Sequence, residues 1–576
     1  MSTRQKFFLL IFVAAIGFNA TVFAQTRKLS ANDYVDKMKG GWIGQMAGVG
    51  QSAPTEFKWN GVICPEGEMP AWKDEMVNQF DQDDIYVEMT FLRTLEMYGL
   101  DVTAQQAGID FANSDYNLWH ANMIARNNLR SGIAPPDSGH PQFGKHTDDI
   151  DYQIEADFSG LISPGMPNMV IEFGEKFGTI MNYGDGLYGG QFVAGMYAEA
   201  FFERDVEKIV RAGLRCIPEQ SQYAECVRDV LRWHAENPDD WEKSWSLINE
   251  KYQKNPRYRS YSCTGPKADF NIDAKINGAY IVMGLLYGEG DIEKTIVVSA
   301  RCGQDSDCNP SSAAGVLCTS IGFSKLPEKY KSALDENQKF SYTTYNFPGL
   351  ADVCEKLARQ VVVRADGRIE KRFFNLIGED MFVIKTGEAV PGRNQQSQRP
   401  GPISNSKYTE EEMKLITGFT AAELYEGLNK FAPGWEISYC GNSTPRDIPG
   451  LHEEKSGRKN VFVTHPFGNE TGCVLSKVVE IPADKKTVLK LTVGHHLAEG
   501  KHPDGDWELV VKADGEAVLS KIIGKGSCEG GWTDIDVDLS KFAGKTVKLE
   551  LVNQTNELLD ERYEIGYWQK IELVTE

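Results

Sequence analysis

Apolar residues recur at helical spacing through the first half of the chain. One such run, ANDYVDKMKGGWIGQMAG, follows Ser30, which is a good helix N-cap; others run from Asp84 to Leu100 and, repeatedly, from Asp205 to Glu250. Apolar residues three and four positions apart line one face of a helix and allow it to pack on a shared core. The pattern therefore predicts an all-α domain over residues 25–350.

The pattern changes to alternation toward the C-terminus. Residues 367–390 alternate as strands do, whereas residues 390–408 are rich in Pro, Gly, Gln and Ser and show no period. From residue 409 onward, short alternating segments are separated by Gly, Asp and Lys turns, which is typical of a β-sandwich. We expect a multi-domain protein with a β-hairpin extension and linker over 351–408 and an all-β sandwich over 409–576.

The first 24 residues predict export. Arg4 and Lys6 precede an apolar run from Phe7 to Phe18, and Val22-Phe23-Ala24 is suited to cleavage before Gln25. The apolar run is shorter than the roughly 20 residues that a membrane-spanning helix needs, and no Cys follows it to carry a lipid. We expect a cleaved signal peptide over 1–24, no membrane anchor, and a periplasmic or secreted protein.

The net charge argues against one class of partner, and the cysteine pattern against two kinds of structural site. The net charge of −21 argues against a nucleic-acid partner, whose binding depends on Lys and Arg contacts with phosphate. The 11 cysteines are scattered without a CxxC spacing, and their odd number leaves at least one unpaired. The sequence therefore supports neither a compact disulfide framework nor a zinc site.

Two stretches carry paired carboxylates directly before apolar helical runs. Asp83 and Asp84 begin the first run, and Asp305 and Asp307 precede the small-residue run that starts near Pro310. A single Asp at such a position is explained by helix capping. Adjacent anions repel, however, and a shared hard cation such as Mg²⁺ or Mn²⁺, which prefers oxygen ligands, removes that repulsion. The pairs favour a metal site over capping alone.

These stretches resemble the motifs of the ADP-ribosylglycohydrolase family. The family's Thr-Asp-Asp motif corresponds to Gln82-Asp83-Asp84, and its Gly-Asp-x-Asp-Thr motif to residues 304–308; the Pro-x-Glu turn after its glycine-rich helix corresponds to 54–56, which places Glu56. The resemblance, from Leu29 to Phe323, implies an all-helical fold with an active site that holds two Mg²⁺, or Mn²⁺ in some members. The implied metal ligands are Gln82, Asp83, Asp84, Asp305, Asp307 and Cys308, with Glu56 as a catalytic residue.

Three departures from the family pattern limit what the resemblance implies about substrate. Gln82 replaces a hydroxyl ligand with an amide oxygen, Cys308 brings a soft sulfur that suits Mg²⁺ poorly, and Gln45 stands where many members carry an aspartate. The metal geometry or the number of ions is therefore expected to differ, and tight specificity for ADP-ribose does not follow.

A third acidic stretch, HTDDIDYQIEADFSGLISPG, begins at His146. At helical spacing Asp148, Asp151 and Glu155 share one face, for which a solvated acidic surface is the simpler interpretation. The resemblance implies that this segment lines the substrate cleft, which makes Glu155 and Asp157 candidates for acid–base catalysis or sugar contacts. Asp151 and Asp185 are candidate substrate-binding residues, although capping explains Asp185 equally well.

These expectations combine into a function. The leading hypothesis is an exported metal-dependent glycoside hydrolase that cleaves a furanosyl or related bond in an extracellular glycan or glycoconjugate. The alternatives are an ADP-ribosyl hydrolase and a non-catalytic sugar-binding protein. The predicted sandwich resembles the galactose-binding or jelly-roll modules of secreted glycan-active enzymes, and its aromatic residues either bind sugar or pack the sandwich core: Trp507, Trp532, Tyr567 and Trp568.

Overall fold

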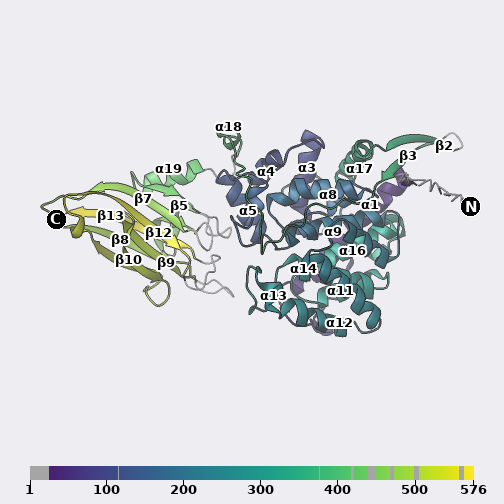
Figure 1. Cartoon of the computed structure of the whole chain (residues 1–576), viewed down its shortest axis with the longest axis horizontal. Coiled ribbons are helices and arrows are strands. Elements are labelled where there is room, and N and C mark those ends of the chain that lie inside the picture. The colour runs from purple at the N-terminus through teal and green to yellow at the C-terminus, as the bar shows by residue number, and fades with distance from the viewer. Residues whose placement is uncertain are drawn as a thin grey trace, which may run out of the picture.

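The computed structural model shows a helical domain and a β-sandwich (Figure 1). The residues that it describes are 25–114, 116–374, 377–416, 421–438, 440, 449–466, 472–497, 505–556 and 564–575. The expected signal peptide lies outside the described residues. Among the helices in the described ranges, none combines the length and the apolar character that crossing a bilayer requires.

The helical domain confirms the predicted all-α fold. Its α-helices are α1 (Ala31–Ser52), α2 (Asp83–Tyr86), α3 (Glu88–Tyr98), α4 (Ala104–Ala112), α5 (His120–Arg130), α6 (Asp151–Ile154), α7 (Asp157–Leu161), α8 (Pro167–Phe177), α9 (Asp185–Ala200), α10 (Val206–Arg215), α11 (Gln222–Glu236), α12 (Trp241–Ile248), α13 (Pro256–Arg259), α14 (Ala274–Tyr287), α15 (Ile292–Arg301), α16 (Cys308–Ile321) and α17 (Phe347–Arg364). Since α17 runs across residue 350, the helical unit extends past the expected boundary.

Close contact between α1 and α16 sets the centre of this domain. A Cβ on Gly44 would lie 2.3 Å from the Ala314 carbonyl oxygen, and a Cβ on Gly48 would lie 2.4 Å from that of Pro310. Both distances are far below van der Waals contact, so the glycines allow the two backbones to touch. Every residue of α16 from Cys308 to Ser320 is buried. The N-terminal end of α16, with its acidic residues, is thereby fixed inside the domain.

A small sheet joins the N-terminus to the predicted hairpin. β1 (Gln25–Ser30) pairs antiparallel with β3 (Ile377–Thr386), which also pairs with β2 (Arg368–Phe374), in the order β1-β3-β2. The Arg27 guanidinium bonds to Glu199 of α9 at 2.9 Å, so the sheet is attached to the helical domain. The hairpin expected over 351–408 is therefore part of the helical unit.

The predicted linker also lies on the helical domain. The Tyr188 hydroxyl of α9 donates to the carbonyl of Arg393 at 3.1 Å, and the amide of Gly401 donates to the Tyr183 hydroxyl at 2.8 Å. The amide of Ser406 donates to Asp137 at 2.8 Å. This segment has no regular period because side chains of the helical domain supply its hydrogen-bond partners.

The C-terminal domain is an antiparallel sandwich, as predicted. Its two five-stranded sheets have the orders β10-β9-β12-β7-β4 and β11-β8-β13-β6-β5. The strands are β4 (Glu436–Ser438), β5 (Gly450–Lys455), β6 (Arg458–Thr464), β7 (Cys473–Glu480), β8 (Thr487–His495), β9 (Trp507–Ala513), β10 (Glu516–Ile523), β11 (Trp532–Asp538), β12 (Thr546–Gln554) and β13 (Gly566–Thr575). Two helices come before these strands in the chain: α18 (Glu410–Met413) and α19 (Ala421–Phe431).

The aromatic residues of the sandwich pack its interior. Trp507 and Trp568 are fully buried, with ring centroids 5.3 Å apart, and Trp532 and Tyr567 are also buried. Of the two interpretations left open by the sequence, core packing is therefore the observed one for these four residues. They are not platforms on which a sugar ring stacks.

Candidate metal centre

The two acidic stretches, far apart in the chain, meet at the N-terminal end of α16. Asp83 and Asp84 are the first residues of α2, and Asp307 is the N-cap of α16. One carboxylate oxygen from each of Asp84 and Asp307 and the Cys308 sulfur lie within 4.8 Å of one another. A second set, with the same mutual limit of 4.8 Å, is Glu56, Asp305 and Asp307. Asp307 is thus shared by two adjacent groups of candidate ligands, which we call the acidic centre.

The acidic centre is buried and poorly satisfied by the protein. Both carboxylate oxygens of Asp84, and Oδ1 of both Asp305 and Asp307, have no hydrogen-bond partner of ordinary geometry within the described part of the chain. The polar groups that do face these carboxylates are one another, the Cys308 thiol and, at Asp307, the backbone amides of Asp307 and Cys308. Buried carboxylates with too few donors are costly, and a hard divalent cation is the partner that such an oxygen set fits.

Crowding raises the pKa values across the centre. Burial and the charge of Asp307 raise the pKa of Asp83 to about 6. Desolvation, together with the charges of Asp307 and Asp83, raises the pKa of Glu56 to about 8, although Glu56 as a whole reaches solvent at the rim of the centre. Burial and neighbouring carboxylates also hold the pKa of Asp84 and of Asp305 well above the ordinary range. Without a cation, the centre favours protonated carboxyls.

Cys308 and Gln82 occupy different positions relative to this centre. Burial and the surrounding carboxylates hold the pKa of the Cys308 thiol well above its ordinary value, so it remains protonated and serves Asp84 as a hydrogen-bond donor. Gln82, the N-cap of α2, donates its amide to the Gln79 side chain at 3.3 Å. That bond leaves the Gln82 amide oxygen available as a ligand.

Neutral polar residues that the motif comparison did not identify support the acidic centre. The Thr55 hydroxyl lies 2.8 Å from the Ser306 hydroxyl, which joins the turn of Glu56 to the loop of Asp305 and Asp307. The Asn277 side chain of α14 accepts from Asn309 at 2.9 Å. Thr55 and Ser306 adjoin the acidic residues in sequence, and that adjacency was the available signal. Nothing in the local sequence indicated Asn277.

The third acidic stretch does not form one helical face. Asp148 precedes α6, Glu155 is the residue after it, and α7 begins only at Asp157. All four acidic candidates of this stretch are buried, so the expected solvated face is also wrong. Asp151 accepts hydrogen bonds from the backbone of Ala121 and Asn122 at the start of α5, at 3.2 and 2.8 Å. Tertiary contacts, rather than helical periodicity, place these carboxylates.

Glu155 and Asp157 lie in different surroundings. Glu155 accepts a hydrogen bond from the Asn122 side chain, and burial together with Asp151, Asp83 and Asp84 holds its pKa well above the ordinary range. Its Oε2 has no hydrogen-bond partner among the described residues. Asp157 instead accepts from the Tyr197 hydroxyl at 2.6 Å. Burial raises the pKa of Asp157 to about 8. The charges of the acidic centre therefore act on the pKa of Glu155, whereas Asp157 links α7 to α9 through its hydrogen bond with Tyr197.

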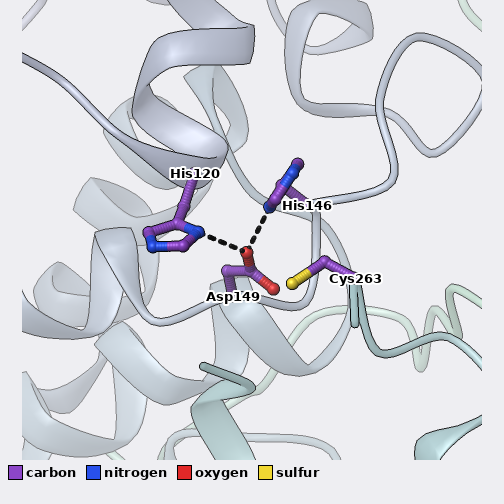
Figure 2. Close-up of side chains that lie close together, drawn as sticks. All are labelled: His120, His146, Asp149 and Cys263. Carbon is purple, nitrogen blue, oxygen red and sulfur yellow. Dashed lines mark hydrogen bonds and ion pairs between the residues drawn. The ribbon is translucent and has the colours of Figure 1, made fainter. Parts of the chain in front are cut away.

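A second cluster of potential ligands contains nitrogen and sulfur. The atoms of His120, His146, Asp149 and Cys263 that can bind a metal lie within 4.8 Å of one another (Figure 2). His146 Nδ1 is 2.6 Å and His120 Nδ1 is 3.6 Å from Asp149 Oδ2. No sequence motif marks this cluster, because His120 and Cys263 come from segments far from His146 and Asp149.

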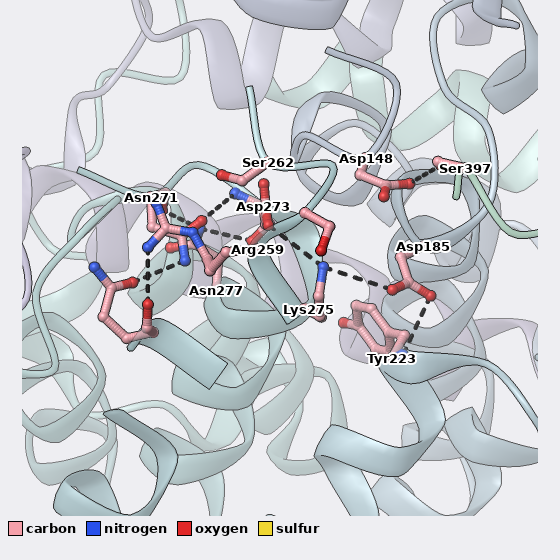
Figure 3. Close-up of polar contacts among 12 residues, drawn as sticks. Asp148, Asp185, Tyr223, Arg259, Ser262, Asn271, Asp273, Lys275, Asn277 and Ser397 are labelled. Atoms are coloured by element: carbon pink, nitrogen blue, oxygen red, sulfur yellow. Dashed lines mark hydrogen bonds and ion pairs between the residues drawn. The ribbon is translucent and has the colours of Figure 1, made fainter. Parts of the chain in front are cut away.

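Asp185 belongs to a buried charge network around Lys275 (Figure 3). Lys275 Nζ lies 3.4 Å from Asp273 and 3.7 Å from Asp185, which also accepts from the backbone of Tyr223 at 3.2 Å. Burial lowers the pKa of Lys275, but the charges of Asp273 and Asp185 outweigh it and hold that pKa above its ordinary value. Asp148 adjoins the same network. Burial raises the pKa of Asp148 to about 8 despite the nearby ammonium group of Lys275. Asp185 is thus held by a cation and a helix terminus.

The helical domain has counterparts among known proteins. A family model described as ADP-ribosylglycohydrolase matches residues 30–368, more than half of the chain and beyond the expected end at Phe323. A solved structure titled "ADP-ribosylglycohydrolase-related protein complex" has 13% identity and a TM-score of 0.36, covering 57% of this chain and 99% of its own. A cyclase from Fischerella sp. TAU has 12% identity and a TM-score of 0.20, covering 25% and 85%. No curated protein matches.

Proposed function

This chain belongs to the ADP-ribosylglycohydrolase family, and from that premise we propose that it is an exported metal-dependent glycoside hydrolase acting on a furanosyl or related bond of an extracellular glycan or glycoconjugate. Membership of the family supports a hydrolase of this fold. The observation that carries the metal dependence is the acidic centre, where buried oxygens of Asp84, Asp305 and Asp307 have no ordinary donor among the described residues.

The oxygen-rich part of the centre fits Mg²⁺ or Mn²⁺. Asp83, Asp84, Asp305 and Asp307 would hold one or two ions, with Gln82 able to add an amide oxygen. Cys308 is better suited to a supporting role, since a protonated thiol donates to Asp84 and sulfur is a poor ligand for a hard cation. When bound, the divalent cation supplies positive charge that polarises sugar hydroxyls and assists water activation.

The protein's own acids and bases suit glycosidic cleavage. Glu56 is the candidate base, because it is exposed at the rim, and although crowding raises its pKa to about 8 in the metal-free centre, a bound divalent cation would favour the ionised carboxylate that a base requires. Glu155 is the candidate proton donor, because burial holds the pKa of its carboxyl well above the ordinary range, which favours the protonated form, and its Oε2 is unpartnered among the described residues. Asp157, which is bonded to Tyr197, would act through packing rather than proton transfer.

Two features of the chain favour an extracellular sugar substrate. The first 24 residues have the pattern of a signal peptide, and an antiparallel sandwich follows the helical domain. Sandwich modules of this kind accompany secreted glycan-active enzymes. The family relationship itself supports a second candidate, an ADP-ribosyl hydrolase that is exported, whose substrate would also present a ribofuranosyl bond.

A substrate screen separates these candidates. The purified mature chain would be incubated with furanosyl and pyranosyl glycosides, with polysaccharides, and with ADP-ribosyl-arginine and ADP-ribosyl-serine, each in Mg²⁺ and in EDTA. Magnesium-dependent release of sugar from a glycoside, lost in Asp307→Asn, supports the leading proposal. Cleavage of only the ADP-ribosyl compounds supports the second candidate. Absence of turnover together with saturable sugar binding supports a non-catalytic sugar-binding protein.

A further inference from the structure

The cluster of His120, His146, Asp149 and Cys263 has the composition of a transition-metal site (Figure 2). It offers two imidazole nitrogens, one thiol sulfur and one carboxylate oxygen, within 4.8 Å of one another. Four ligands of these types are typical of a closed tetrahedral zinc site. Mg²⁺ and Ca²⁺ are poor matches, because they prefer oxygen ligands.

The carboxylate of this cluster is incompletely satisfied by the protein. Asp149 is fully buried, and its Oδ2 faces both imidazoles at 2.6 and 3.6 Å. Its Oδ1 accepts no hydrogen bond of ordinary geometry from the described residues, and the polar group beside it is the Cys263 thiol. Asp149 thus faces the two imidazoles with Oδ2 and the Cys263 sulfur with Oδ1, so a cation held among the four side chains would satisfy its carboxylate.

Contacts with the surrounding protein hold Asp149 and His120 in place before any metal binds. The backbone of Asp149 is fixed by the Asn182 side chain, which donates to its carbonyl at 2.9 Å. His120 opens α5, and its ring stacks on Phe270 with centroids 5.8 Å apart. Neutral ring contacts and backbone hydrogen bonds of this kind are the outer contacts that orient metal ligands. His120 and Cys263 are only partly buried, which gives an ion a route from solvent.

The loop that carries Cys263 is held rigidly at its base. The Arg259 guanidinium, fully buried, donates to the carbonyls of Gln253, Gly265 and Phe270 at 3.0, 2.8 and 3.1 Å (Figure 3). Asn271, which follows Phe270 in the chain, donates its side-chain amide to the Gln253 side chain at 2.8 Å. A loop anchored at both ends presents Cys263 at a defined position, which a four-ligand site requires.

We propose that His120, His146, Asp149 and Cys263 bind one zinc-class transition-metal ion, at a structural site separate from the acidic centre. The ion fastens the 260–270 loop to the start of α5. That attachment reaches the acidic centre through aromatic contacts, since Phe270 packs on both His120 and Phe57, with centroid distances of 5.8 and 5.1 Å. Phe57 follows Glu56 directly in the chain. Metal binding is therefore expected to stabilise the packing of Phe270 on Phe57, next to Glu56, without contributing a reacting group.

The test measures metal rather than catalysis, so it is independent of the proposed hydrolase activity. Mature protein without a histidine tag would be purified, stripped with a chelator, and titrated with Zn²⁺ and Co²⁺ in excess Mg²⁺, with zinc content measured by mass spectrometry. We expect about one equivalent bound, and a thiolate-to-Co²⁺ charge-transfer band together with the intense visible bands of tetrahedral cobalt. These measurements on the wild-type chain need no variant to fold.

Matched variants assign the ligands. Cys263→Ala and His146→Ala should each weaken Co²⁺ binding by more than about 100-fold, beyond the loss typical of outer-shell changes, and Cys263→Ala should abolish the charge-transfer band. Cys528→Ala, at another partly buried cysteine, and His234→Ala should bind as the wild type does. Asp307→Asn should also retain the zinc and the band. A wild-type chain that binds no Zn²⁺ or Co²⁺ tightly, or a band that survives in Cys263→Ala, would overturn the proposal.

Discussion

Asp84 and Asp307, from opposite halves of the helical domain's sequence, each place a carboxylate oxygen within 4.8 Å of the other at the N-terminal end of α16. Both side chains are buried, and neither pairs with a lysine or arginine among the ion pairs of the described residues. Two buried anions this close repel strongly. Their relationship makes the response of the protein to Mg²⁺ the most direct test of the site.

Replacing Asp307 should separate metal binding from stability. Asp307→Asn removes the carboxylate shared by both ligand groups, so calorimetric titration should show Mg²⁺ binding weakened by about 100-fold or more, beyond the loss typical of outer-shell changes. In EDTA the same variant should be more stable than the wild type, because it removes one buried anion from a group of carboxylates that repel one another. The exposed Asp239→Asn is the control. Unchanged Mg²⁺ affinity in Asp307→Asn would remove the basis for the metal centre.

The stability of the metal-free protein should fall as pH rises. The folded-state pKa is about 6 for Asp83 and about 8 for Glu56, above the ordinary values of their carboxyls. The folded state therefore binds more protons than the unfolded chain between about pH 4 and 8, and the free energy of unfolding decreases with pH across that window.

Denaturant titrations at pH 5 and pH 8 measure this dependence. In EDTA the unfolding midpoint should be lower at pH 8, whereas saturating Mg²⁺ should flatten or reverse the difference by pairing with the ionised carboxylates. Asp307→Asn should show a shallower dependence than the wild type in EDTA. A midpoint in EDTA that rises from pH 5 to pH 8 would contradict the assigned pKa directions.

Glu56→Gln should impair turnover far more than metal binding. Glu56 lies at the exposed rim of the centre, and it is the candidate base of the proposed reaction. Loss of a general base typically lowers kcat by about 10²–10⁴-fold, while the buried carboxylates remain to hold Mg²⁺. The measurement is steady-state kinetics on whichever glycoside the screen identifies, alongside calorimetry. Glu66→Gln, at an exposed position on the following loop, is the matched control, and equal kinetics for the two variants would exclude Glu56 as the base.

Lys275→Met should destabilise the protein strongly at neutral pH. The change leaves Asp185 and Asp273 without their buried cation, and loss of one partner of a buried ion pair costs about 3–5 kcal/mol. The loss should be smaller at lower pH, because burial raises the pKa of Asp185 and favours its neutral form once the ammonium group is gone. Denaturant unfolding measures both values, with Lys294→Met, whose pair with Glu289 is exposed, as the control. Equal stability losses for the two lysine variants would contradict the network's role.

The contact between α1 and α16 should be intolerant of a single methyl group. In Gly48→Ala the new Cβ would lie 2.4 Å from the backbone of Pro310, so the helices must separate. Overpacking of this kind costs roughly 1–3 kcal/mol or more, and displacement of α16 should also weaken Mg²⁺ binding. Gly67→Ala, with open space around the added Cβ, should change neither. Thermal unfolding with and without Mg²⁺ tests this, and wild-type behaviour of Gly48→Ala would contradict it.

The sequence predicted the features that depend on local patterns. Helical spacing and alternation predicted the all-α domain and the sandwich, because each element buries one regular face. The paired carboxylates of Asp83 with Asp84 and of Asp305 with Asp307 indicated one site, because adjacent anions before buried helices need a common counter-charge. Both inferences used information that neighbouring residues carry.

Features that depend on contacts between distant segments were not predictable in this way. Glu155 follows a helical spacing, but its backbone leaves the helix there and its position depends on Asn122 of α5. Cys263 meets His120 and His146 only through the tertiary fold, so no motif marks the cluster. The domain boundary at 350 was misplaced because a periodic helix, α17, continues across it.

The path of residues 390–408 sets where the helical domain can be cut. Tyr408 is buried, its hydroxyl donates to the carbonyl of Gln105 at 3.1 Å, and Ser397 donates to Asp148 beside the Lys275 network. A truncation that removes residues 390–408 would expose the surface on which Tyr408 packs. It would also remove the Ser397 hydroxyl that donates to the buried Asp148. A stand-alone catalytic fragment should therefore end after Tyr408, and protease trimming of the intact chain should release fragments that begin beyond it.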